Sequence, residues 1–327
     1  MPGNNTLTRI VTAVVLLSAA ASAWSQTNYP AKAVRFVVPY AAGGSVEPLV
    51  RLFTVKMSER FGQAMTVDPR PGGNTIIGSE IVARAAPDGY TVLVMTIQNH
   101  VINALLIRHL PYDSVKDFAP VATMSTSDYM LVLHPSVPAN NLKSFIALAK
   151  TRPGQLNYGS VGSLGISQLG TESFCQMAGI RMQRVPYKGS APALIDLASG
   201  ELQVGFNTPI SSMPHVHSKR LKPIAISGEQ RLAALGEVPT FREAGLPGFE
   251  MRVTYAVLAP AATPRAVIDK LSAEFGRIVA LPETRERLAQ RGMLPLYSTP
   301  EQTASQLQAN LAQYAKVIQS GKLQIEK

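Results

Sequence analysis

The stretch from Val34 to Arg51 constrains the fold of this chain more than any other. Residues 34–38 form a short apolar run that stops at Pro39, as a buried strand does. Small residues fill 41–45, and apolar residues then recur at helical spacing, with Pro48 suited to the first helical position. This order of strand, glycine turn and helix points backbone N–H groups beyond the strand, where the helix dipole favours a negative charge. Alone, the pattern is equally that of an ordinary strand-to-helix turn.

Length and charge narrow the possible partners. With 327 residues, the chain is long enough for two domains of ordinary size. Lys and Arg outnumber Asp and Glu by 31 to 21, which gives a formal net charge of +10. The basic residues are scattered along the chain, so we expect no nucleic-acid partner. A diffuse positive field suits a small anionic ligand.

The N-terminus has the pattern of a secretory signal peptide over residues 1–23. Arg9 precedes an apolar stretch that is too short to span a membrane, and Ala21-Ser22-Ala23 fits the small-residue cleavage rule. We therefore expect a mature protein that begins near Trp24 and is located in the periplasm. Its single cysteine, Cys175, has no partner for an internal disulfide and suits a buried apolar position.

Short apolar runs alternate with amphipathic segments along the remaining chain, which predicts parallel sheets covered on both faces. Beyond the first strand, we expect strands at 65–67, 90–96, 118–124, 129–134, 156–160, 182–186, 202–206, 221–227 and 249–258. We expect helices at 76–85, 144–150, 167–177, 211–217, 264–281 and 300–320, and one that Ser190 caps. The α/β series starts again after Pro135, which indicates two lobes joined by two long strands. The first lobe takes residues 24–127 and 252–327, and the second takes residues 128–251.

Both lobes contain a glycine-rich loop directly after a strand. These loops cover residues 41–45 and residues 160–165. Ligands of open α/β sheets bind beyond the carboxyl ends of the strands, so the two loops predict a cleft that closes between the lobes.

Many short motifs, in one order from Tyr29 almost to the C-terminus, resemble the Bug (TctC-like) family of extracytoplasmic solute receptors. They are Tyr29-Pro30-Ala31-Lys32, the VVPYAAGG turn, Arg70-Pro71-Gly72-Gly73, Ala86-Pro87-Asp88-Gly89-Tyr90-Thr91, Leu110-Pro111-Tyr112-Asp113, Asn157-Tyr158-Gly159-Ser160, Val185-Pro186-Tyr187-Lys188-Gly189, Val238-Pro239-Thr240 and Ala259-Pro260. The resemblance implies an α/β fold of the type II periplasmic-binding-protein class, with two lobes, two crossover strands and a ligand cleft. It also implies a monomeric receptor that delivers a small carboxylate to the membrane subunits of a tripartite tricarboxylate transporter. Catalysis, a cofactor and a metal are not expected.

Five positions depart from the pattern of that family. The chain has Ala42 for a common Pro, Glu47 for a common Asp, Gln168 for a common His, Asn207 for a common Asp, and Thr254 for a frequent Trp. Positions that face the expected cleft have therefore changed, so the identity of the ligand does not carry over from any relative.

The candidate ligand-binding residues come from both glycine loops and from the end of a third strand. They are Tyr40, Ala42, Gly43, Gly44, Ser45 and Glu47, then Ser160, Val161, Gly162, Ser163, Gly165 and Gln168, and finally Asn207 and Thr208. The serines can donate to a carboxylate or bond only to their own backbone. Asn207 can contact the ligand or occupy a turn.

Glu47 has two interpretations. As the residue before Pro48, it can cap the helix by accepting a backbone N–H. Alternatively, it receives an amine or amide of the ligand, because a carboxylate beside an anion site otherwise weakens that site.

Two other function classes stay open. A secreted hydrolase would need a nucleophile elbow, and Ser160 and Ser163 each lack one of its glycines. A receptor that presents its closed form to a sensor protein would use the same fold as a transport receptor. His215 and His217 flank Val216 without nearby carboxylates or cysteines, which is typical of a solvated helix face and not of a metal site.

Overall fold

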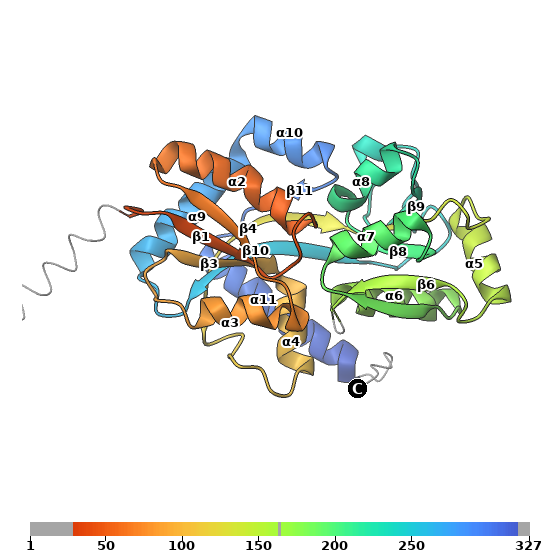
Figure 1. Ribbon diagram of the computed structural model, residues 1–327, viewed down its shortest axis with the longest axis horizontal. Helices are drawn as coiled ribbons and strands as arrows, with labels where there is room; N and C mark the ends of the chain where they lie inside the picture. The colour runs from red at the N-terminus through yellow and green to blue at the C-terminus, as the bar shows by residue number, and fades with distance from the viewer. Residues whose placement is uncertain (1–28, 163–164, 320–327) are drawn as a thin grey trace, which may run out of the picture.

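The computed structural model describes residues 29–162 and 165–319. Two α/β lobes lie side by side, and long strands run between them (Figure 1). The signal peptide expected over residues 1–23 lies outside the described residues.

The first lobe contains a six-stranded sheet in the order β11-β4-β10-β3-β1-β2. Its strands are β1 (Val34–Val38), β2 (Met65–Pro69), β3 (Thr91–Thr96), β4 (Phe118–Asp128), β10 (Arg252–Pro260) and β11 (Leu294–Pro295). The β1, β2 and β3 strands are parallel, while β10 runs antiparallel to both β3 and β4. The helical segments of this lobe are α2 (Val46–Phe61), η1 (Gly73–Thr75), α3 (Ile76–Ala83), α4 (Ile97–Leu106), α9 (Arg265–Ala280), α10 (Pro282–Gln290) and α11 (Pro300–Gln319).

The second lobe repeats this plan in a five-stranded sheet, in the order β7-β6-β8-β5-β9. Its strands are β5 (Met130–Leu133), β6 (Asn157–Val161), β7 (Gln183–Tyr187), β8 (Val204–Asn207) and β9 (Lys222–Ile226). Again three neighbours, β7, β6 and β8, are parallel, and β5 runs antiparallel to β8. The helical segments are α5 (Leu142–Thr151), α6 (Ile166–Ala178), α7 (Ser190–Ser199), α8 (Pro209–His217) and η2 (Ala233–Leu235).

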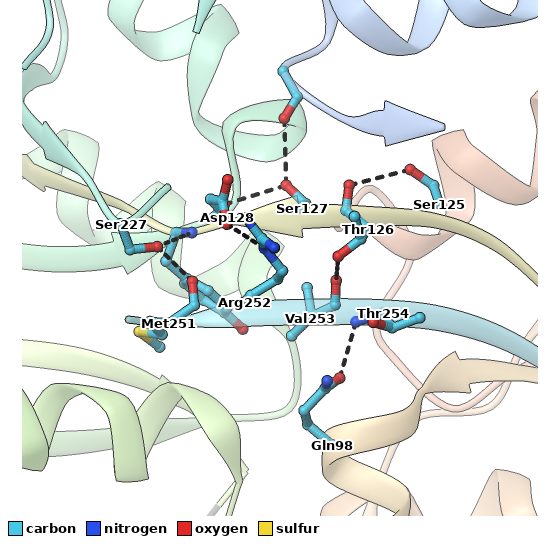
Figure 2. A network of polar contacts seen from close by, with 12 residues as sticks. Gln98, Ser125, Thr126, Ser127, Asp128, Ser227, Met251, Arg252, Val253 and Thr254 are labelled. Atoms are coloured by element: carbon cyan, nitrogen blue, oxygen red, sulfur yellow. Dashed lines mark hydrogen bonds and ion pairs between the residues drawn. The ribbon is translucent and has the colours of Figure 1, made fainter. Parts of the chain in front are cut away.

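The chain passes between the sheets where β4 gives way to β5 and where β10 begins, and Figure 2 shows the polar contacts there. The Arg252 guanidinium pairs with the Asp128 carboxylate at 2.7 Å, across the two strands. Next to this pair, the Tyr129 N–H donates to the Met251 carbonyl at 3.0 Å. The Thr126 hydroxyl also bonds to the second strand, at the Val253 carbonyl. Side chains therefore add to the backbone pairing where the chain leaves one sheet for the other.

The lobe boundaries at residues 127/128 and 251/252 stay a prediction. The expected parallel pairing holds for three neighbouring strands in each sheet, whereas the crossover strands enter each sheet antiparallel to their neighbours. Such strands come from the other lobe and not from a βαβ unit, so alternation along the sequence did not reveal their direction.

Several local expectations were wrong. Helix α2 begins at Val46, two residues before Pro48, and its N-cap is Ser45. The N-cap of α7 is Gly189, and Ser190 is already helical. Strand β4 continues to Asp128, four residues beyond the expected end. Helices α4 and α10 were missed. A capping box precedes α11, where Thr299 and Gln302 each bond to the backbone N–H of the other.

Candidate functional site

The candidate site is a cavity between the lobes, here called the inner cavity, with a volume of about 40 Å³. Its lining residues come from both sheets and both crossover strands. They are Tyr40, Ser45, Val46, Thr96, Asn99, Tyr129, Gly159, Val161, Ile166, Ser167, Ser190, Ala193, Phe206, Asn207, Thr208, Val253 and Tyr255. None of these residues carries a charge at neutral pH, whereas hydroxyl and amide groups are frequent among them. The cavity therefore offers a ligand neutral hydrogen-bonding groups.

Five helices begin at the wall of the inner cavity. The lining includes the N-cap or first-turn residues of α2, α4, α6, α7 and α8. The N-cap residues of α2, α7 and α8 provide no side-chain cap, so they leave first-turn N–H groups for another acceptor. Convergent helix N-termini make this a region of positive potential, although its lining holds no cationic side chain.

The Tyr255 hydroxyl is a buried donor that borders the inner cavity. The residue is completely buried on β10, and its hydroxyl has no hydrogen-bond partner among the described residues. Burial raises the pKa of Tyr255 to about 12, even though the hydroxyls of Ser45 and Thr208 lie near enough to lower it. Tyr255 is therefore a neutral donor at neutral pH, and its hydroxyl makes no hydrogen bond within the described part of the protein.

A second group of polar side chains holds the base of α4 against the first lobe's glycine loop. The Tyr40 hydroxyl lies 3.1 Å from the Thr96 hydroxyl and accepts from Asn99 Nδ2 at 3.2 Å. Burial raises the pKa of Tyr40, so this phenol is also neutral. Asn99 additionally accepts, through Oδ1, from the Ile166 N–H at 3.1 Å. That bond joins α4 of the first lobe to the first residue of α6 in the second.

The lobes touch at further points across the cleft between them. A Cβ atom on Gly44 would lie 2.9 Å from the Ser190 hydroxyl, and one on Gly189 would lie 2.9 Å from the Ala41 side chain. A Cβ atom on Gly162 would lie 1.8 Å from Asn74 Oδ1. Glycine is therefore needed where the loops of one lobe meet the other.

A second, larger cavity, here called the outer cavity, adjoins the inner one and has a volume of about 460 Å³. Its lining residues are Pro39, Tyr40, Gly72, Gly73, Asn74, Thr75, Ile76, Ile107, Val161, Gly162, Pro186, Tyr187 and Lys188. Tyr40 and Val161 belong to both cavities. Asn74 and Thr75 have positive φ angles of 55° and 75°, which are unusual for residues with a side chain.

The structure brings six of the predicted residues to these cavities. Tyr40, Ser45, Val161, Asn207 and Thr208 line the inner cavity, and Gly162 lines the outer one. Ala42, Gly43, Gly44, Ser160, Gly165 and Gln168 do not line either cavity. Ser163 lies outside the described residues. Whether any of these residues binds a ligand stays a prediction.

Glu47 adopts a structural role different from the expected N-cap. It lies inside α2, and its carboxylate accepts from the Gly43 N–H at 2.8 Å. The same carboxylate accepts from the Arg51 guanidinium, with distances of 2.6 and 2.9 Å. The bond from Gly43 and the contact with Arg51 hold the pKa of Glu47 below its usual value. The Glu47 side chain therefore stabilises the glycine turn, and it lines neither the inner nor the outer cavity.

Two buried polar side chains, one in the second loop and one in the first turn of α6, also lie outside the cavity linings. The Ser160 hydroxyl donates to the Gly162 carbonyl at 3.1 Å, within its own loop. Gln168 is 3% exposed, and its Oε1 atom has no partner among the described residues. The prediction that a ligand is held between loop 41–45 and loop 160–165 stays a prediction, and each loop contacts other residues of the opposite lobe. The first loop meets Gly189 and Ser190, and the second meets Asn74 and Asn99.

Sequence reasoning missed several lining residues. Thr96, Asn99, Tyr129, Ser167, Ser190 and Tyr255 all line the inner cavity. The Thr96 hydroxyl caps α4 by accepting from the Asn99 N–H, a Thr-x-x-Asn spacing that was readable as a helix start. For Tyr255, alternation along a buried strand gives no sign of which face borders a cleft.

Residues 29–162 and 165–319 were compared for groups of side chains that could bind a metal ion. No group of three His, Cys, Asp or Glu side chains in these ranges is placed to hold a metal ion. The same ranges contain no helix that is long and apolar enough to cross a membrane.

A family model described as the tripartite tricarboxylate transporter family receptor (TctC) matches residues 49–323. Among proteins known by sequence, the chain is 33% identical over 314 residues to a UPF0065 protein in the tcbD-tcbE intergenic region of Pseudomonas sp. strain P51. That match covers 95% of this chain and 93% of the relative.

Solved structures show the same architecture. Rpa4515 of R. palustris, solved with adipate, is 32% identical, with a TM-score of 0.86 and coverage of 89% of this chain and 97% of that one. MatC (Rpa3494) of Rhodopseudomonas palustris, solved with bound malate, is 28% identical, with a TM-score of 0.83 and coverage of 89% and 100%. The expected type II periplasmic-binding-protein fold is thereby confirmed.

Proposed function

The chain belongs to the tripartite tricarboxylate transporter receptor (TctC, or Bug) family, and from this premise we propose that it closes its two lobes on a small carboxylate. The observation that carries this proposal is the inner cavity, where a buried phenol without a partner among the described residues meets five helix N-termini. A carboxylate provides acceptor oxygens for these donors. Its negative charge is also favoured by the helix dipoles.

The available donors are sufficient for useful affinity. Micromolar binding corresponds to about 8 kcal/mol. Each hydrogen bond to a charged group contributes about 1.5–3 kcal/mol. The hydroxyls of Tyr255, Ser45 and Thr208, together with two first-turn N–H groups, reach that range after the cost of ordering the ligand.

The remaining parts of the proposal come from the family. Relatives of this fold hold adipate and malate, so a small carboxylate is the expected ligand class here. We further propose that the mature, monomeric protein acts in the periplasm and passes the carboxylate to the membrane subunits of a tripartite transporter. No catalytic step is required, because capture needs only donors that stay protonated. Burial raises the pKa values of both Tyr40 and Tyr255, which keeps them in that state.

Thermal unfolding in the presence of candidate ligands tests the binding proposal. We expect the melting temperature of the mature protein to rise with at least one carboxylate from a panel that includes adipate and malate, since a ligand of the folded form stabilises it by mass action. Calorimetry should then give a lower affinity for Tyr255→Phe, by about tenfold or more, because the variant loses one donor to a charged group. Tyr297→Phe is the matched control, since its hydroxyl bonds to Ser272 outside the cleft.

A panel without any shift at millimolar concentration would contradict the proposal. If the wild type and Tyr255→Phe bound the carboxylate with equal affinity, the inner cavity would not be the binding site. Delivery is tested separately, by reconstituting uptake of the same carboxylate with the transporter's membrane subunits in the presence and absence of the receptor.

A further inference from the structure

Asn99 bonds to both lobes through a single amide group. Its Oδ1 atom accepts from the Ile166 N–H of the second lobe at 3.1 Å. Its Nδ2 atom donates to the Tyr40 hydroxyl of the first lobe at 3.2 Å. The backbone N–H of Ile166 can only donate, so it permits only one orientation of the amide. Contact between the lobes therefore determines which atom of Asn99 faces Tyr40.

The N-terminus of α6 is built to receive Asn99. Ile166 is the first residue of α6, and the N-cap, Gly165, has no side chain that could satisfy the N–H groups of the first turn. Asn99 provides an acceptor from the other lobe. A Cβ atom on Gly165 would lie 3.0 Å from Asn99 Oδ1, so glycine leaves room for this approach. Helix α6 is thus capped by a residue of the opposite lobe.

The orientation of Asn99 sets the direction of the next hydrogen bond. A hydroxyl oxygen accepts two hydrogen bonds and donates one. The Tyr40 oxygen accepts from Asn99 Nδ2 and, at 3.4 Å, from the Thr96 N–H, which fills its capacity as an acceptor. Tyr40 therefore donates its proton across the 3.1 Å contact to the Thr96 hydroxyl oxygen.

The Thr96 hydroxyl is left with a proton to donate. Its oxygen accepts from Tyr40 and, at 3.4 Å, from the Asn99 N–H, so both of its acceptor positions are used. Its own proton has no acceptor within residues 29–162 and 165–319. Thr96 is 6% exposed and lines the inner cavity. A buried hydroxyl with an unused proton thus borders the space proposed for the ligand.

We propose that Thr96 donates a hydrogen bond to the bound carboxylate, and that Asn99 is the positioning residue that makes this donor available when the lobes meet. The inference rests on the proposed function, because it adds a donor to the site proposed there. When the lobes are apart, the Asn99 amide is free to turn over and accept from Tyr40, and Thr96 then donates to Tyr40 in place of a ligand. Ligand binding and contact between the lobes therefore favour each other through these three side chains.

Two substitutions and their combination test the proposal. Calorimetry measures the dissociation constants of the wild type, Thr96→Val, Asn99→Leu and the double variant for adipate, malate and any other carboxylate that binds the wild type. Both substitutions keep the approximate size of the side chain and add no charge. Thr96→Val should weaken binding about tenfold or more, because it removes one donor to a charged group. In the Asn99→Leu background, the same change should weaken binding by no more than about threefold, because Asn99 no longer directs the Thr96 proton to the ligand.

Thr299→Val is the matched control for the loss of a helix cap. Thr299 caps α11 as Thr96 caps α4, by accepting from the N–H three residues further on, and it lines neither cavity. Both threonine-to-valine variants should lower the melting temperature of the ligand-free protein by similar amounts, whereas only Thr96→Val should weaken binding. Thr96→Ser keeps the hydroxyl and the cap, so it should bind at least about tenfold more tightly than Thr96→Val.

Two results would overturn the inference and leave the proposed carboxylate receptor in place. If Thr96→Val bound the carboxylate as tightly as Thr299→Val, the Thr96 proton would not serve the ligand. If Thr96→Val weakened binding equally with and without the Asn99 side chain, Asn99 would not position the donor. Failure of every carboxylate to bind the wild type would instead contradict the proposed function itself.

Discussion

At the scale of single residues, Glu47 makes the clearest prediction, because its carboxylate holds the glycine turn and Arg51 together. We expect Glu47→Gln to lower the free energy of unfolding by about 1 kcal/mol at neutral pH. The pKa of Glu47 is lowered from 4.5 in the folded protein, so this stabilisation is present above pH 4.5 and disappears as the pH falls through the lowered value. In denaturant titrations from neutral to about pH 3, the free energies of unfolding of the wild type and Glu47→Gln should converge.

Glu237→Gln, at an exposed position, is the control. A variant that kept full stability and lost ligand affinity would instead place Glu47 in contact with the ligand.

Residue types were easier to predict than side-chain directions. The small and hydroxyl-bearing residues of both loops were identified from sequence, and Ser45 does line the inner cavity. Ser160 has the same chemistry and bonds within its own loop. The difference depends on a rotamer and on contacts from distant segments, which the local sequence does not contain. Tyr255 shows the same limit, since its neighbours Ser45 and Thr208 lie on two other elements of the fold.

At the scale of elements, the first glycine turn joins β1 to α2 and also touches the N-terminus of α7. A Cβ atom on Gly44 would lie 2.9 Å from the Ser190 hydroxyl, and the backbone φ at Gly44 is not in the left-handed region. Gly44→Val should therefore weaken ligand binding by about tenfold or more, because it holds the lobes apart, and should change the melting temperature of the free protein little. Gly236→Val is the control, since no atom lies within 4 Å of the added Cβ there. Calorimetry and thermal unfolding check the pair, and unchanged affinity in Gly44→Val would contradict the contact.

Elements with a distinct period or a distinct turn were predictable, and elements without them were not. Glycines mark the turn from β1 to α2 at Gly43 and the end of α6 at Gly179. Helix α4 follows β3 without a turn residue. Residues 97–103 are all buried, polar side chains such as Asn99 included, so the polar positions of this helix do not mark a solvent-exposed face. Only the Thr96 N-cap marked the helix that contributes Asn99 in the sequence.

At the scale of the whole molecule, the two-lobe plan was predictable because the same α/β series occurs twice. The directions of the crossover strands were not, since each enters the sheet of the other lobe. Polar contacts such as the Asp128–Arg252 pair hold the strands together at the crossing (Figure 2). Because the lobes are connected there and meet again at the loops, motion between them is expected to be the hinge type of domain closure.

Closure of the lobes should be measurable in solution. An inner cavity of about 40 Å³ between touching lobes admits a ligand only after they separate, so the free protein should have a larger radius of gyration than the ligand-bound protein, by X-ray scattering. The contact of Gly162 with the other lobe can be tested by substitution. Gly162→Ala should weaken this compaction, because its Cβ would lie 1.8 Å from Asn74 Oδ1 across the cleft. Gly154→Ala is a matched control: its φ of +76° is nearly that of Gly162, +75°, and nothing lies within 4 Å of its Cβ. Both variants carry the same backbone strain, of about 1–2 kcal/mol, so a difference in compaction between them isolates the contact between lobes. If both variants compact fully with ligand, the loops do not gate closure, and the strands at the crossing alone set how far the lobes move.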